Sequence, residues 1–259
     1  MKLNVPYAGN EKLKEVCKKV ADSDRLQGFW KVANINAIDR MSINDHGPIH
    51  SKIVANSGLK ILRILTDFGI EPSVVEDHDL DVEDAEVIVV LAASLHDLGH
   101  IVHRTHHEEF AIPVAQNLLP NLIGHLYDAR FGAIMEAEIL QAMYSHKTSV
   151  KPLTVEAGVV KVADALDMEE GRARIPFSEG EVTIHSVSAL SIEEVSIARG
   201  EKKPVRITIE MSNSAGIFQL DNLLKPKLDS SGIGQYIETK VLVRPEGEKE
   251  KKIVDEYEL

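Results

Sequence analysis

Apolar residues recur every three or four positions along most of the first 174 residues, which is the spacing of helices that bury one face. Proline and capping residues mark where these segments begin, and glycine or loop-forming residues mark where they end. The pattern predicts helices over residues 11–22, 26–38, 48–68, 82–99, 106–118, 132–145 and 155–168, with a short helix or turn over 120–128. No convincing strand is expected before residue 174, so the sequence predicts a mainly α protein.

The most apolar of these segments runs from Val87 to Ser94 and closes on Leu95-His96-Asp97-Leu98-Gly99-His100. Gly99 is expected to end the helix in the left-handed conformation that glycine adopts readily after a last helical turn. A histidine and a carboxylate at the inner end of a buried segment are costly unless something pairs with them. The sequence therefore marks this stretch as a candidate functional site.

The pattern changes in the last third of the chain, where apolar and polar residues alternate with the period of half-buried strands. It predicts strands over residues 181–185, 205–211 and 237–243, and a helix over 217–228 that Pro226 shortens or bends. We therefore expect a helical domain over residues 1–176 and a small α+β domain over 177–259, built on an antiparallel sheet. The alternating strands are compatible with a homo-oligomer or with a lid, and the sequence does not choose between them.

Composition and charge restrict the classes of partner that the chain is expected to bind. The chain carries 29 basic and 41 acidic residues, a formal charge of −12, which argues against a nucleic-acid polymer because such binding rests mostly on neutralised phosphates. A small anionic substrate held by a local cation is compatible with this charge. The lone cysteine, Cys17, cannot form an internal disulfide. No apolar run approaches the ~18 residues of a membrane span, and no signal peptide is recognisable, so we expect a cytoplasmic protein without a membrane partner.

Histidine and aspartate residues lie on or beside the apolar stripes of five predicted helices. His50, for example, shares a stripe with Val54, Ile61 and Leu65. One histidine in such a position is usually a core residue with a satisfied hydrogen bond. Several together each need a partner that aliphatic side chains cannot supply, and divalent cations satisfy all of them. The predicted metal ligands are His50, His96, Asp97, His107, His146 and Asp164.

The ligand types restrict the metal. A mixed imidazole and carboxylate set suits Mn, Fe, Co, Ni or Zn better than Mg or Ca, and the absence of cysteine ligands disfavours structural zinc or an iron–sulfur cluster. Six protein ligands exceed what one catalytic ion with an open position needs. Two ions about 3.5–4 Å apart would use all six, and Asp97 is the predicted bridge between them.

Five motifs, in their order along the chain, resemble those of the HD-domain metal-dependent phosphohydrolases. They are His50-Ser51-Lys52-Ile53-Val54, Leu95-His96-Asp97-Leu98-Gly99, His107-Glu108-Glu109-Phe110-Ala111, His146, and Val160-Lys161-Val162-Ala163-Asp164-Ala165-Leu166-Asp167. The resemblance covers residues 43–172 and implies an all-helical fold. It implies one metal held by the first histidine, the His-Asp pair and the last aspartate, which are His50, His96, Asp97 and Asp164. It implies a second metal at His107 and His146.

The resemblance also directs attention to His100, because many family members have a lysine there that is thought to contact the substrate phosphate. The Leu-His-Asp-Leu-Gly-His form resembles the triphosphohydrolase branch instead. Asp97, His100 and Arg104 are the predicted catalytic residues, with His103 as an alternative phosphate contact. Lys147 and Arg172, or Arg174, are predicted to bind remaining substrate charge. Of the adjacent pair His106-His107, His107 is preferred as a ligand because it aligns with the stripe of Ala111, Val114 and Leu118.

The predicted function is hydrolysis of a phosphoester or phosphoanhydride bond in a small molecule, with a nucleotide as the favoured substrate. Two alternatives stay open at this point. The same helical scaffold with a His/Asp di-iron set occurs in inositol-oxygenase-like proteins, and a metal site can also bind a nucleotide in a regulatory module without turning it over. The sequence names neither the substrate nor the physiological metal.

Overall fold

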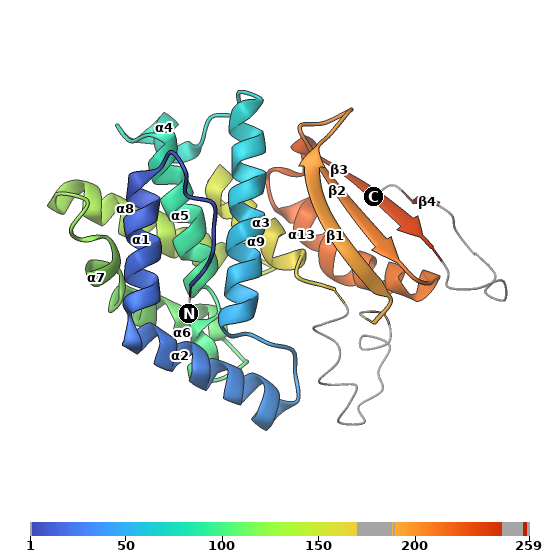
Figure 1. The fold of residues 1–259 in the computed structure, drawn as a ribbon, viewed down its shortest axis with the longest axis horizontal. Helices are drawn as coiled ribbons and strands as arrows, with labels where there is room; N and C mark the ends of the chain where they lie inside the picture. Colours follow the sequence, from blue (N-terminus) through green and yellow to red (C-terminus); the bar gives the residue numbers. More distant parts are fainter. Residues whose placement is uncertain (1, 170–187, 189, 245–255, 258–259) are drawn as a thin grey trace.

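The computed structural model describes residues 2–169, 188, 190–244 and 256–257. Figure 1 shows a bundle of helices packed beside a small sheet that carries its own helical segment. The helical part comprises α1 (Glu11–Asp22), α2 (Asp24–Asn34), the π-helical η1 (Ile35–Arg40), α3 (Pro48–Asp67), α4 (Ser73–Asp77), α5 (Val82–Leu95), the 3-10 turn η2 (Leu98–Ile101), α6 (His107–Gln116), α7 (Leu119–Ile123), α8 (Ala129–Ser145) and α9 (Val155–Ala165). The mainly helical fold is confirmed.

Helix α5 is the centre of the bundle. Every residue from Asp84 to Leu95 is buried, as expected for a helix whose run from Val87 to Ala93 is apolar on all sides, and α1, α3, α8 and α9 pack around it. A reciprocal capping box between Asp81 and Asp84 fixes its first turn. The helix therefore delivers the residues that follow it to the interior of the bundle.

The end of α5 differs from the prediction. The helix stops at Leu95, and Leu98–Ile101 forms a tighter 3-10 turn. Gly99 is not among the described glycines with a positive φ, so its predicted left-handed conformation was wrong. Its requirement is close packing instead, because an added Cβ would lie 1.8 Å from the carbonyl oxygen of His107. The backbones of η2 and α6 thus meet where only glycine fits.

The described sheet has the order β1 (Ile192–Arg199), β2 (Val205–Met211), β3 (Ile237–Val243) and β4 (Glu256–Tyr257). The predicted strands over 205–211 and 237–243 are confirmed, whereas β1 was not predicted and the strand expected over 181–185 lies outside the described residues. The antiparallel prediction was wrong in one pairing. β2 and β3 run parallel, while β1 with β2 and β3 with β4 are antiparallel, so the sheet is mixed.

A helical crossover joins the two parallel strands, as parallel pairing requires. It consists of η3 (Ser214–Gly216), α12 (Ile217–Gln219), the π-helical η4 (Leu220–Leu224), α13 (Lys225–Ser230) and η5 (Gly234–Tyr236). The helix expected over 217–228 is present, and Pro226 lies in the first turn of α13, after the π-helical segment. α13 and η4 pack on α9, while β1 and β2 contact α3. No helix in the described ranges is long and apolar enough to cross a membrane.

Candidate metal centre

Five helix ends of the bundle bring the predicted ligands together. His50 lies in the first turn of α3, which Pro48 begins. His96 and Asp97 follow α5, His107 begins α6, His146 follows α8, and Asp164 lies in the last turn of α9. His50, His96, Asp97 and His146 are buried, and His107 and Asp164 are partly buried. The sequence-predicted ligand set therefore forms one cluster within the bundle.

Four of these side chains, those of His50, His96, Asp97 and Asp164, bring ligand atoms close together around the two imidazoles. The Nε2 atom of His50 lies 3.2 Å from Nε2 of His96 and 3.2 Å from Oδ1 of Asp164. Oδ2 of Asp97 lies 3.3 Å from Nε2 of His50 and 3.4 Å from Nε2 of His96. Ligands bound to one divalent ion at about 2.0–2.2 Å are separated by about 3.0–3.5 Å. This first set thus has the spacing that a single ion requires.

The other oxygen of Asp97 faces a second set. Oδ1 lies 3.4 Å from Nε2 of His107, 3.7 Å from Nε2 of His100 and 4.0 Å from Nε2 of His146. The Nε2 atoms of His107 and His146 are 3.3 Å apart. Asp97 therefore presents one oxygen to each set, which is the geometry expected of a bridging carboxylate between two ions.

Hydrogen bonds at Nδ1 hold these imidazoles in place. His96 pairs through Nδ1 with the carbonyl of Ala93 at 2.9 Å, and His107 with that of Arg104 at 2.9 Å. His146 makes the same type of bond to the carbonyl of Met143, one turn earlier on α8. A histidine that donates from Nδ1 has its Nε2 lone pair free for a metal. The backbone thus fixes the tautomer that ligation needs.

A carboxylate plays this role for His50. Its Nδ1 atom lies 2.5 Å from Oδ2 of Asp167, which is 4% exposed. Carboxylate–imidazole pairs behind a metal ligand orient the ring and increase its basicity. Asp167 had no role in the prediction, although it ends the same sequence motif that contains Asp164.

His100 provides the sharpest indication that the centre binds something. The side chain is fully buried, and neither ring nitrogen has a hydrogen-bond partner among the described residues. Burial lowers its pKa to about 2, so the ring is neutral. An unpaired buried imidazole is costly, and a cation at the second set would relieve that cost. The donor set and this unpaired ring both fit a divalent metal.

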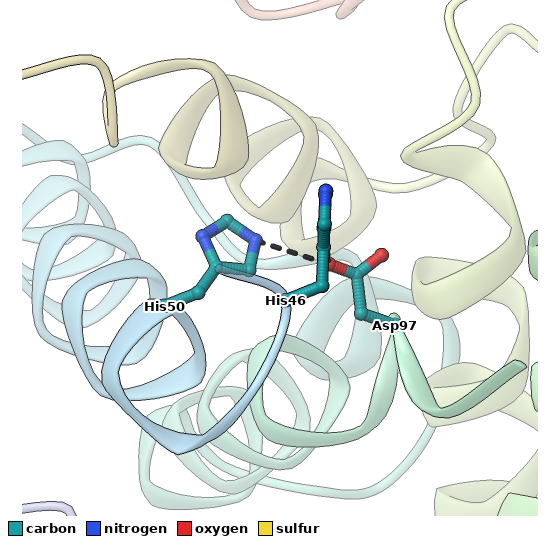
Figure 2. A group of neighbouring side chains, drawn as sticks. All are labelled: His46, His50 and Asp97. Atoms are coloured by element: carbon teal, nitrogen blue, oxygen red, sulfur yellow. Dashed lines mark hydrogen bonds and ion pairs between the residues drawn. The ribbon is translucent and has the colours of Figure 1, made fainter. Parts of the chain in front are cut away.

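His46 belongs to the cluster but was not predicted. Its Nδ1 atom lies 2.7 Å from Oδ2 of Asp97, and its ring stacks on that of His100 with centroids 4.3 Å apart. Figure 2 shows His46 and His50 converging on the Asp97 carboxylate. Arg104 is exposed and donates to Nε2 of His46 at 3.1 Å. The predicted catalytic residue Arg104 therefore reaches the centre through His46.

The electrostatics of the cluster favour a bound cation. Burial opposes ionisation of Asp97, yet the neighbouring His96 and His46 hold the pKa of this carboxyl well below its usual range. Although burial disfavours a charged His96, Asp97 and Asp164 raise the pKa of its imidazole to about 9. Burial lowers the pKa of His146 well below its usual value. The two carboxylates thus favour positive charge close to His96, which a divalent ion would supply.

The basic residues that were predicted to bind substrate differ in their surroundings. Lys147 pairs with Glu109 at 2.7 Å and lies 3.8 Å from Glu108, so it joins the loop after α8 to the first turn of α6. Arg172 and Arg174 lie outside the described residues. A cation that the sequence did not point to, Lys227 of α13, forms an ion pair with Oδ2 of Asp164.

Comparison with known proteins identifies the same part of the chain. A family model described as the HD domain matches residues 49–169, which include all six predicted ligands. The uncharacterised protein MJ1020 of Methanocaldococcus jannaschii is 42% identical over 243 residues, covering 94% of this chain and 92% of that protein. No solved structure is significantly similar to this chain. His46 and Lys227 both lie outside the matched residues.

Proposed function

The chain belongs to the HD-domain family through residues 49–169, and from this premise we propose that it is a metal-dependent phosphohydrolase. The proposed reaction is hydrolysis of a phosphoester or phosphoanhydride bond in a small molecule, with nucleotides as the substrate class. The observation that carries this proposal is the carboxylate of Asp97, whose two oxygens face two separate sets of imidazole ligands. Such a pair of neighbouring sites suits transfer of a phosphoryl group to water.

The proposed function assigns the six predicted ligands to two metal ions. His50, His96, Asp97 and Asp164 would hold one ion of the Mn, Fe, Co, Ni or Zn type. His107 and His146 would hold a second with the other Asp97 oxygen. Bound there, such ions supply an acidic water and neutralise charge on phosphoryl oxygens.

Other protein groups orient the predicted ligands or are placed to contact the substrate around that centre. Asp167 keeps the His50 ring oriented, while the backbone carbonyls behind His96, His107 and His146 keep their Nε2 atoms directed inward. Arg104, exposed beside His46, is placed to contact substrate charge at the solvent side. His100 is the remaining proposed catalytic residue, because its unpaired nitrogens lie within the second set.

Metal analysis combined with a substrate panel tests the proposal. The purified protein is loaded with Mn, Co or Ni and assayed for phosphate release from nucleoside mono-, di- and triphosphates, cyclic nucleotides and dinucleoside polyphosphates. We expect release from at least one class, which chelation abolishes. Substrate-dependent oxygen consumption after anaerobic iron loading would instead support an oxygenase. Tight nucleotide binding without turnover would support a regulatory module.

Replacing His146 by alanine is expected to remove one of two bound ions and to retain the other. His146 faces Oδ1 of Asp97 and Nε2 of His107, whereas the first set on Oδ2 stays intact. Metal content per chain, measured by mass spectrometry, should fall from about two ions to about one. His125→Ala is the matched control because His125 is exposed. Full metal content in both His146→Ala and His107→Ala would contradict a two-ion centre.

A further inference from the structure

Lys227 brings a positive charge to the centre from outside the HD domain. It lies on α13, in the crossover between β2 and β3, and its Nζ atom donates to Oδ2 of Asp164. The residue is only 7% exposed. A buried ammonium group is costly to maintain without anionic partners, so its position beside a predicted metal ligand calls for an explanation.

Close packing of the crossover on α9 fixes the position of Lys227. Leu224 and Leu228 are buried on either side of it. Gly158 of α9 allows the chain after α13 to approach, because an added Cβ would lie 2.5 Å from the carbonyl oxygen of Ser231. The lysine is therefore held against the centre by the fold of the C-terminal segment.

The ion pair leaves most of the ammonium group unused. An ammonium has three N–H donors, and among the described residues only Asp164 accepts from Lys227. The other oxygen of Asp164, Oδ1, lies 3.2 Å from Nε2 of His50. A cation bound at Oδ1 would draw charge from the carboxylate and weaken its hold on Lys227. The ammonium would then require a second anion.

Two other lysines that contact the loop after α8 or its neighbours differ from Lys227, because the donors of Lys161 are committed and Lys147 is only partly buried. Lys161 donates to the carbonyls of Lys147, Thr148 and Val150 at 3.1, 3.2 and 2.6 Å. Lys147 itself is paired with Glu109. Within the described part of the chain, Lys227 thus combines burial, unused donors and contact with a predicted ligand.

On the basis of the proposed phosphohydrolase function, we propose that Lys227 is a substrate-binding residue that donates to a phosphoryl oxygen on the Asp164 side of the centre. The C-terminal segment then supplies part of the active site. Lys227 would then act as a phosphate-contacting lysine. His100 occupies the position after the His-Asp motif where the sequence resemblance leads one to expect such a lysine. Substrate recognition in this chain thereby depends both on the HD domain, which ends at residue 169, and on the C-terminal segment that follows it.

Inorganic phosphate is the probe that tests this role. Parent and variant proteins are loaded with Mn²⁺, their metal content is measured, and phosphate is titrated by calorimetry. Lys227→Met is expected to retain the manganese content of the parent and to bind phosphate about tenfold more weakly or worse, because a charge-assisted hydrogen bond is lost. Lys227→Arg, which keeps the charge, is expected to fall between the two. Lys225→Met, an exposed lysine on the same helix, should change the affinity less than about twofold.

Each outcome decides the inference. Unchanged phosphate affinity in Lys227→Met would overturn it, as would a parent protein that binds Mn²⁺ but no phosphate. Loss of manganese in Lys227→Met would assign the lysine to holding Asp164 alone and would also overturn it. If that variant does not fold, Lys227→Gln, which keeps a donor without the charge, replaces it. A parent that binds phosphate but hydrolyses no substrate would refute the proposed function, while the titration still decides the role of Lys227.

Discussion

Replacing Asp97 by alanine is expected to abolish metal binding at both sets and, with it, phosphate release. The two oxygens of this carboxylate face the two sets separately, so one substitution removes a ligand from each. It also removes the carboxylate whose oxygens lie within 3.4 Å of four imidazoles, those of His46, His50, His96 and His107. Because metal ions contribute several kcal/mol to such reactions, activity should fall at least about a thousandfold. Metal analysis and the phosphate-release assay measure the two effects.

The helical fold should survive this change. Asp97 lies after the end of α5, and the apolar packing of that helix does not depend on the carboxylate. Circular dichroism of Asp97→Ala should therefore match the parent, which separates loss of the centre from unfolding. Asp79→Ala is the control because Asp79 is exposed, and it should keep both metal and activity. A full metal content in Asp97→Ala would show that this carboxylate does not bridge the two sets.

The clustering of the predicted ligands could be expected from the sequence because they lie at positions that helical periodicity identifies. His50 and His146 continue the apolar stripes of α3 and α8, and burial of a stripe carries every residue on it inward. His46 precedes α3, where no repeat applies. Lys227 approaches Asp164 only through the packing of α13 on α9. Contacts of this kind depend on tertiary structure, and no local pattern encodes them.

In the sheet, the sequence pattern gives the buried face of each strand but not its direction or register. Alternation of apolar and polar residues shows which face of β2 and β3 is buried, and both strands alternate regularly. It does not show strand direction, because parallel and antiparallel strands share a period of two. β1 escaped prediction because an irregularity between Ile192 and Glu194 interrupts its pairing and its burial pattern. The register was therefore available only from the structure.

Gly99→Ala is expected to destabilise the protein and to damage the second set selectively. The added Cβ would lie 1.8 Å from the carbonyl oxygen of His107 and 2.8 Å from the backbone nitrogen of Ala111. Both are backbone atoms of α6, so relief requires α6, which carries His107, and η2 to move apart, and we expect α6 to be displaced. Overpacking of this kind costs about 1–3 kcal/mol or more, which should lower the melting temperature by several degrees.

The number of metal ions that Gly99→Ala retains distinguishes selective loss of the second set from general destabilisation of the protein. The residues of the first set lie in α3, in α9 and directly after α5. These three helices contact one another directly, so their packing does not depend on α6. Gly99→Ala should therefore lose about one of two ions, as His146→Ala does, while it retains the other. Gly28→Ala in the middle of α2 is the matched control, because no atom lies within 4 Å of its added Cβ and helix propensity favours alanine by about 1 kcal/mol. Equal loss of both ions in Gly99→Ala would mean that η2, rather than α6, yields to the clash and carries Asp97 away from both sets.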